Sequence, residues 1–396
     1  MTEVRIDSYG HGGLGVGRVG GKVHFVEGAL PGDLVEVEVV REKRSWARAR
    51  TVSVIEPGPA RRPAPCPHAP ACGGCDLQHA DEAAQREWKR EVLADQLHRI
   101  AGLEGPPVGA VVAPGADFGY RNRMDFSVLG SRPALHRRSS SELVGLDQCL
   151  LLAPPLVELF GRLGDLTGAS ALTIRAGINT GDLLVVLTGD LPAAADEWGA
   201  AVCRSHREGT EVVVDRDHLY EEVAGRRFRI TASAFFQNST SGAEALVALV
   251  GDAVSGRTGR LVDLYAGGGL FACTVGGGFE RVVAVEAAEP ALSDLRANTL
   301  GSDVEIHADR VERLVIDGSG DTTVVVDPPR SGLGRDGVDT VIGLAPERLV
   351  YVSCEPASFA RDVGYLGESG YALTSATPVD LFPQTHHIET VAILDR

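Results

Sequence analysis

The chain has 396 residues, of which 44% are hydrophobic and 23% are charged, the composition of a globular protein with two or three domains. A net charge of −16 argues against a protein that coats nucleic acid nonspecifically, although it allows a local basic groove. No apolar run approaches the ~18–20 residues of a membrane span. The N-terminus has no basic segment followed by an apolar one, so we expect a cytoplasmic protein with no membrane partner.

Residues 1–58 predict a small β domain. Glycines punctuate short segments, and residues 35–39 alternate apolar and charged side chains, as a strand with one buried face does. Short strands between glycine turns favour a small closed barrel. Basic residues around Trp46 are typical of a nucleic-acid surface, but a solvated edge strand protected by charge explains them equally well. These basic residues are Arg41, Lys43, Arg44, Arg48 and Arg50.

Closely spaced cysteines follow a proline-rich linker. Cys66, Cys72 and Cys75 lie on one short segment, and Cys149 comes much later. Without a secretory signal, metal ligation is a better interpretation than a disulfide framework. Four thiolates suit an iron–sulfur cluster or tetrahedral zinc, and the spacing alone does not distinguish them. Unligated structural thiols are the remaining alternative.

The middle of the chain predicts a helix followed by strands. The helix runs from near Asp81, a suitable N-cap, to Ala101. Its apolar stripe consists of Ala84, Trp88, Val92, Leu93, Leu97 and Ile100. From about residue 118 to 232 the chain has strand patterns separated by turns, for example at 171–178 and 182–188. We therefore assign residues 59–234 to a central α+β domain that carries the four cysteines.

Residues 235–396 alternate strand-like and helical segments. The strand-like runs are 261–265, 281–286, 322–327 and 348–353. This alternation is typical of an α/β fold with a doubly wound, Rossmann-like parallel sheet.

A glycine turn marks a candidate cofactor site in this region. The segment from Asp263 to Gly269 ends a strand, and its spacing D-x-x-x-G-x-G resembles the cofactor loop of class I methyltransferases. Glu286 ends the next strand, where a carboxylate would meet ribose hydroxyls. The turn lacks the G-x-G-x-x-G pattern of dinucleotide enzymes, which disfavours an oxidoreductase. An ordinary tight turn is the alternative.

Three further segments carry candidate catalytic groups. Asp327 ends a strand before two prolines, so it should lie at the carboxyl edge of the sheet. Cys354 follows a strand and precedes Pro356, a residue suited to the start of a helix, and a thiol near a helix N-terminus should have a lowered pKa. A buried packing cysteine is the alternative. Glu389 begins the last strand, after two histidines that could form a weak metal pair or no site.

Taken in order, these segments resemble the uracil-5 RNA methyltransferase family, whose members make 5-methyluridine in tRNA and in 23S rRNA. The resemblance covers essentially the whole chain. Residues 1–58 look like the TRAM domain, the RNA-binding barrel of that family. The four cysteines match the spacing that holds a [4Fe–4S] cluster in many members, so the resemblance favours this cluster over zinc. Phe235-Phe236-Gln237 looks like the segment with a cofactor-contacting glutamine.

The resemblance implies a monomeric RNA (uracil-5-)-methyltransferase that uses S-adenosyl-L-methionine. Cys354 would be the nucleophile and Glu389 the base. Seven residues would contact the cofactor or the target base: Gln237, Tyr265, Gly267, Gly269, Glu286, Asp309 and Asp327. Three positions depart from the family: Leu270 and Glu355 replace the commoner Asn, and Asn238-Ser239 replaces Val-Asn.

The chemistry explains why a thiol and a carboxylate are needed together. Uracil carbon 5 attacks a methyl group only after a thiolate has added to carbon 6, and a base must then remove the proton from carbon 5. The target base should be flipped out of its stack. Two alternatives stay open: rRNA or tRNA as substrate, and a catalytically silent RNA-binding protein with a metal-stapled fold.

Overall fold

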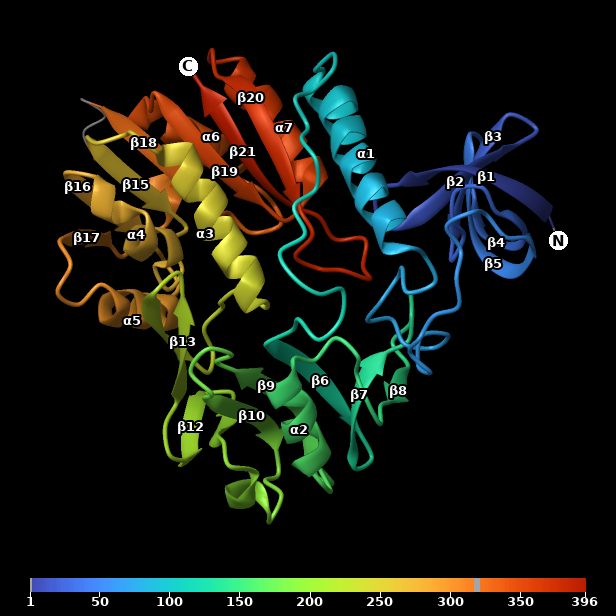
Figure 1. Cartoon of the computed structure of the whole chain (residues 1–396), viewed down its shortest axis with the longest axis horizontal. Helices are drawn as coiled ribbons and strands as arrows, with labels where there is room; N and C mark the ends of the chain where they lie inside the picture. The colour runs from blue at the N-terminus through green and yellow to red at the C-terminus, as the bar shows by residue number, and fades with distance from the viewer. Residues whose placement is uncertain (1, 317–320) are drawn as a thin grey trace.

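The computed structural model describes residues 2–316 and 321–396, and none of its helices is long and apolar enough to cross a membrane. Figure 1 shows the N-terminal barrel on one side of helix α1, the C-terminal sheet on the other, and the central sheet below both. The fold class agrees with the prediction from the sequence.

The N-terminal segment forms the expected closed barrel, with strand order β1-β2-β3-β5-β4. Val35 and Val37 point into its core, but Val39 is 39% exposed, so the inward alternation ends one step earlier than predicted. Buried Asp33 ties the loop before β4 to the segment that follows β5, because it accepts hydrogen bonds from Leu30 N and Gly58 N and pairs with Arg61. The strands are β1 (Thr2–Gly10), β2 (Leu14–Val19), β3 (Lys22–Glu27), β4 (Leu34–Glu42) and β5 (Trp46–Glu56).

Helix α1 (Glu82–Ala101) connects the barrel to the C-terminal sheet. Asp81 caps it as predicted, by accepting from Ala83 N and Ala84 N. Leu93 and Leu97 are buried in the core of the C-terminal sheet, whereas Ile100 is 45% exposed and does not belong to the stripe. In space α1 packs against helix α7 (Pro356–Gly367), far along the chain.

The central region is a seven-stranded sheet with strand order β12-β11-β10-β9-β6-β7-β8, beside a separate β13-β14 hairpin. The strands expected at 171–178 and 182–188 are β9 and β10. The elements are β6 (Arg123–Leu129), β7 (Arg132–His136), β8 (Leu143–Gly145), α2 (Pro154–Arg162), β9 (Ala169–Ala176), β10 (Leu183–Gly189), η1 (Ala195–Trp198), β11 (Ala201–His206), β12 (Gly209–Val214), β13 (His218–Val223) and β14 (Arg226–Thr231).

The C-terminal region is a second seven-stranded sheet with order β17-β16-β15-β18-β19-β21-β20, in which β21 alone runs antiparallel to its neighbours. Buried valines fill its parallel strands, because helices cover both faces. Its strands are β15 (Arg260–Leu264), β16 (Arg281–Val285), β17 (Val304–His307), β18 (Thr322–Val326), β19 (Arg348–Ser353), β20 (Ala372–Val379) and β21 (Glu389–Asp395). The remaining helices are α3 (Thr240–Val254), α4 (Leu270–Thr274), η2 (Gly276–Gly278), α5 (Glu289–Asn298), η3 (Val311–Arg313) and α6 (Gly334–Leu344).

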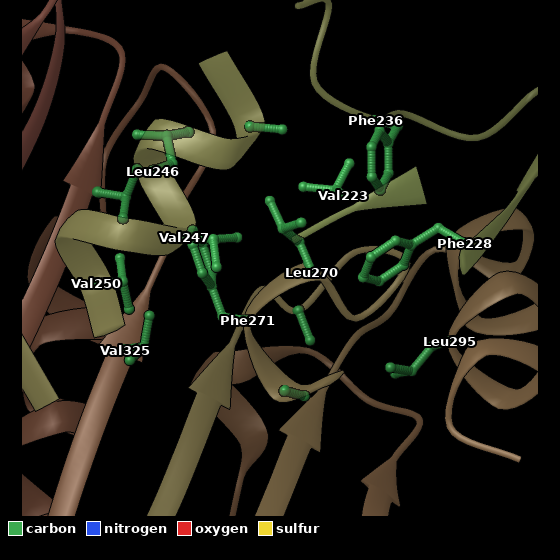
Figure 2. Packing of buried hydrophobic residues seen from close by; sticks show 14 of the residues in the cluster. Val223, Phe228, Phe236, Leu246, Val247, Val250, Leu270, Phe271, Leu295 and Val325 are labelled. Atoms are coloured by element: carbon green, nitrogen blue, oxygen red, sulfur yellow. The ribbon is translucent and has the colours of Figure 1, made fainter. Parts of the chain in front are cut away.

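A hydrophobic cluster supports the glycine turn from one face of this sheet. Figure 2 shows Leu270 and Phe271 packed among side chains of α3, α5 and the β13-β14 hairpin. Leu270 is only 7% exposed. Its departure from the family's Asn therefore has a packing role, since the side chain contributes to this core.

Candidate active site

Strand register brings the candidate groups to one edge of the C-terminal sheet. Leu264 lies opposite both Val285 and Val326, so the segments that follow β15, β16 and β18 leave the sheet side by side. β21 runs the other way, and its Thr390 lies opposite Ser353. Cys354 and Glu389, each one residue away from that pair, therefore belong to the same edge as the glycine turn.

Glu286 fixes the backbone of the glycine turn through hydrogen bonds. Gly267 N donates to this carboxylate at 2.9 Å, and Ala287 N and Ala288 N donate to its other oxygen at 2.7 Å. Gly267 and Gly269 have φ of +55° and +89°, which side chains other than glycine rarely adopt. No atom lies within 4 Å of the position of a Cβ at Gly267, so a ligand can approach the backbone there.

Three carboxyl groups lie at this edge: Asp263 and Glu389 are buried, and Asp327 is partly buried. Asp263 accepts from Ala272 N at 2.9 Å, and its other oxygen has no partner among the described residues. Burial, with a smaller effect of the nearby charges of Asp327 and Glu286, raises the pKa of Asp263 to about 7. Burial also raises the pKa of Asp327 to about 7. Burial and the charge of Asp327 raise the pKa of Glu389 well above its usual range, against the effect of Arg330.

Two of these carboxyl groups, Glu389 and Asp327, affect the pKa of the Cys354 thiol. Burial raises its pKa to about 12, and the negative charges of Glu389 and Asp327 add to this effect while Arg330 opposes it. The expected lowering of the pKa by the helix N-terminus is therefore wrong for this protein. Pro356 does begin helix α7 as predicted, but the side chain of Glu355 caps that helix from Ala357 N. Burial and two carboxyl groups outweigh the helix terminus.

The other predicted ligand residues divide between the inside and the rim of the site. Gln237 is 7% exposed, and its neighbour Phe236 packs in the same cluster as Ala266 and Leu270 beside the glycine turn. Tyr265, with φ of +61°, donates from its hydroxyl to Glu312 at 3.2 Å. Asp309 follows β17 on the surface, where its side chain accepts a hydrogen bond from the backbone N–H of the next residue. It therefore does not belong to the set formed by Asp263, Asp327 and Glu389.

The four cysteines Cys66, Cys72, Cys75 and Cys149 line one cavity of about 190 Å³. Burial, reinforced by the other three thiols, raises the pKa of Cys75 to about 12. Within residues 2–316 and 321–396, no three or more His, Cys, Asp or Glu side chains converge on the position of a single metal ion. Of the two histidines near Glu389, His386 is hydrogen-bonded to Asp76 at 2.5 Å.

The sequence did not reveal how the loop before Glu389 is held. Lys89, which is 1% exposed, pairs with buried Asp380 at 2.6 Å and donates to the carbonyl of Phe382. Gln85 and Gln384 exchange two hydrogen bonds of 3.0 and 3.1 Å. The available signal was that Lys89 and Gln85 lie one and two turns before Leu93, in the apolar stripe of the helix. A polar residue in such a stripe indicates a buried partner.

A closed barrel joined to a Rossmann-like sheet, with a glycine turn and buried acids at the sheet's carboxyl edge, defines the class of RNA-modifying methyltransferases. Models of the tRNA (Uracil-5-)-methyltransferase family match residues 200–314 and 305–396, and the TRAM domain model matches residues 2–52. The chain therefore belongs to the RNA (uracil-5-)-methyltransferase family, as its sequence motifs predicted.

Full-length relatives agree with this assignment. The chain is 34% identical to uncharacterised RNA methyltransferases of Thermosynechococcus vestitus and Streptomyces avermitilis, over 99% of its length and 97% and 98% of theirs. It is similar to the solved structure of the Pyrococcus abyssi tRNA (uracil-54, C5)-methyltransferase in complex with S-adenosyl-L-homocysteine. The TM-score is 0.78 at 25% identity, and the match covers 99% of this chain and 100% of that one.

Proposed function

We propose that this protein methylates carbon 5 of a uridine in structured RNA through a covalent bond between Cys354 and the uracil ring. The observation that carries the proposal is the strand register, which brings Cys354, Glu389 and Asp327 to the sheet edge that also holds the glycine turn. A silent RNA-binding protein would have no use for a thiol and a carboxyl group in this arrangement.

The residues of the glycine turn suit S-adenosyl-L-methionine, which supplies a methyl group on a positively charged sulfur when it is bound. The open backbone at Gly267 admits a close ligand, and Glu286 can exchange a backbone partner for ribose hydroxyls. The unpartnered oxygen of buried Asp263 and the partly buried carboxyl group of Asp327 favour a cation nearby. In this proposal Gln237, Tyr265 and Gly269 contact the cofactor as well, and Asp309 contacts it from the surface.

Each proton and bond in the proposed reaction has a place. The Cys354 thiol gives its proton to solvent, its sulfur bonds carbon 6, and the electron pair of the double bond between carbons 5 and 6 moves into an enolate. Carbon 5 then takes the methyl group of the bound donor, whose sulfur keeps the electron pair of the broken bond. The carboxylate of Glu389 then accepts the proton from carbon 5, and the bond between sulfur and carbon 6 breaks. Because the pKa values of both groups are raised, the thiolate of Cys354 is a strong nucleophile and the carboxylate of Glu389 a strong base once each has released its own proton to solvent.

Two clefts between the barrel and the β7 region suit an RNA backbone. They have volumes of about 660 and 430 Å³, and both are lined by Arg137 and Arg138. Arg50 of the barrel lines the first and Arg48 the second, and the second also reaches His386, three residues before Glu389. Arginines along a groove are typical of phosphate contacts.

The variant Glu389→Gln tests the reaction directly. Without the base, the adduct cannot lose the carbon 5 proton, so a protein–RNA complex that survives SDS should accumulate. Cys354→Ala should bind RNA and cofactor but form neither adduct nor product. Full product release by Glu389→Gln, or normal turnover by Cys354→Ala, would contradict the mechanism.

The substrate RNA is tested by offering tRNA and 23S rRNA side by side. By its name the Pyrococcus enzyme acts on uracil 54 of tRNA, so tRNA is the first substrate to try, and rRNA is the alternative. Each RNA is paired with a version whose target uridine is replaced. Appearance of 5-methyluridine in only one intact RNA identifies the substrate, and absence from both would favour the silent RNA-binding protein.

We also propose that the four cysteines hold a [4Fe–4S] cluster rather than zinc. All four thiols line one cavity, and the cysteine spacing of the resembling family favours the cluster over zinc. The cluster would fasten the linker to the central sheet. Protein purified without air should be brown and contain iron, and Cys149→Ser should lose that iron. A colourless, zinc-containing wild-type protein would contradict the proposal.

A further inference from the structure

The turn between β1 and β2 of the barrel, residues 11–13, lies against two loops: the one that carries Cys354 and the one that leads to Glu389. His11 Nε2 is 3.1 Å from Glu355 Oε1, and Glu355 directly follows Cys354. A Cβ placed at Gly13 would come within 3.1 Å of the ring of His386, in the loop that leads to Glu389. One turn of the N-terminal domain thus contacts the segments that carry the proposed nucleophile and base.

The barrel is firmly docked beside this turn. Tyr9, at the end of β1, stacks on Trp88 of α1 with 5.2 Å between ring centroids. Both rings belong to a buried cluster that also includes Ile388, the residue before Glu389. The position of the turn is therefore fixed by a packed interface rather than by the His11 contact alone.

Glu355 links the turn to the backbone around Cys354. The same oxygen that pairs with His11 also accepts from Ala357 N at 3.5 Å, which caps helix α7. The backbone N–H of Glu355 donates to Ser353 Oγ at 3.2 Å. The side chain and backbone of this one residue thus hold the chain on both sides of Cys354.

We propose that His11 is a positioning residue: it holds the Glu355 carboxylate, and through it the loop that aims the Cys354 thiol at the pocket shared with Glu389. The inference rests on the proposed function for the role of Cys354. RNA bound along the barrel would then be positioned relative to Cys354 by the docked barrel and its turn at residues 11–13. Asn, which is commoner at position 355 in the family, could cap the helix but could not form this ion pair.

The contact depends on pH in a defined direction. The hydrogen bond that His11 donates to the Glu355 carboxylate raises the pKa of His11, against the effect of burial. The pKa of Glu355 is lowered by His11 and, to a smaller extent, by Arg330. The ion pair is therefore complete in mildly acidic solution and is lost as the pH rises through the raised pKa of His11.

Four proteins test the proposal: wild type, His11→Asn, Glu355→Asn and the double variant. Hydrogen exchange of the peptide that contains residues 353–358 needs no RNA, and single-turnover methylation at saturating RNA reports on the reaction. Each single change should speed exchange and slow methylation about threefold, the size of a partly exposed ion pair. RNA affinity should not change, and the double variant should match the single ones.

The pH series and a control complete the experiment. The difference between wild type and His11→Asn should shrink as the pH is raised from about 6 to about 8. His98→Asn removes a matched exposed histidine, 4.0 Å from Glu104 at the end of α1, and should change nothing. Multiplying effects in the double variant, or a loss confined to RNA affinity, would overturn the inference. Unchanged exchange would also overturn it, whereas absence of methylation by wild type would count against the proposed function alone.

Discussion

The suppressed ionisation of Cys354 makes a prediction that needs no RNA. At pH 8, a thiol with a pKa of about 12 is ionised in about one molecule in ten thousand, whereas an ordinary cysteine is ionised in about a quarter of the molecules. Only the thiolate reacts with alkylating and thiosulfonate reagents. Cys354 should therefore react about a thousandfold more slowly than an ordinary thiol, and its rate should still be rising above pH 9.

Replacing Asp327 by Asn should release part of this suppression. One nearby charge shifts a pKa by about one unit or more, so the variant should react about tenfold faster at pH 9. The pKa of Asp327 is about 7, and its carboxyl group carries no charge well below that pH. The ratio of the two rates should therefore fall toward one as the pH is lowered through 7.

The assay follows modification of Cys354 by a thiosulfonate reagent, with peptide mass mapping to separate this thiol from the other six cysteines. Asp309→Asn is the matched control, because this exposed acid lies outside the buried group. A wild-type rate that levels off near pH 8.5, or a rate ratio that does not change with pH, would refute the electrostatic account of the site.

Two further substitutions test the supports of the site. Lys89→Met leaves Asp380 buried, with Arg86 at 3.4 Å as its remaining partner, so it should lower the free energy of unfolding by about 3 kcal/mol. Denaturant titration should show most of this loss recovered when Asp380→Asn is added, and no recovery would contradict a charge effect. Gly269→Ala places a Cβ 2.8 Å from Leu295 at a φ of +89°, so it should cost about 1–3 kcal/mol. Calorimetry should show weaker S-adenosyl-L-homocysteine binding, and unchanged affinity would argue against ligand contact at this turn.

The order of the helices and strands, and the edge of the C-terminal sheet at which the site lies, could be predicted because both depend on local sequence patterns. The run Thr322–Val326 is continuously apolar or β-branched, as a strand covered on both faces must be. Parallel topology then brings the ends of successive strands together, so Asp327 and Glu286 could be expected near the glycine turn. The antiparallel last strand, which returns Glu389 to that edge, completes the arrangement.

What could not be predicted depends on neighbours far apart in the sequence. The pKa of Cys354 depends on Glu389 and Asp327, whose distances no local pattern gives. Gln85 and Gln384 are 299 positions apart, and a glutamine in a helix does not indicate which loop it will hold. Ile100 fits the helical period but is 45% exposed in the last turn of α1, so the period alone overestimates the buried stripe.

The route of the chain through α1 decides which pieces of this protein can exist alone. The sheet that carries Cys354 and Glu389 begins after residue 259, yet one of its covering helices comes from residues 82–101, before the whole central sheet. A fragment that begins near residue 260 would leave exposed the apolar surface of the sheet against which Leu93 and Leu97 pack. The C-terminal sheet is therefore not an independent domain. A chimera that exchanges the barrel or the cysteine segment between relatives has to keep α1 together with this sheet.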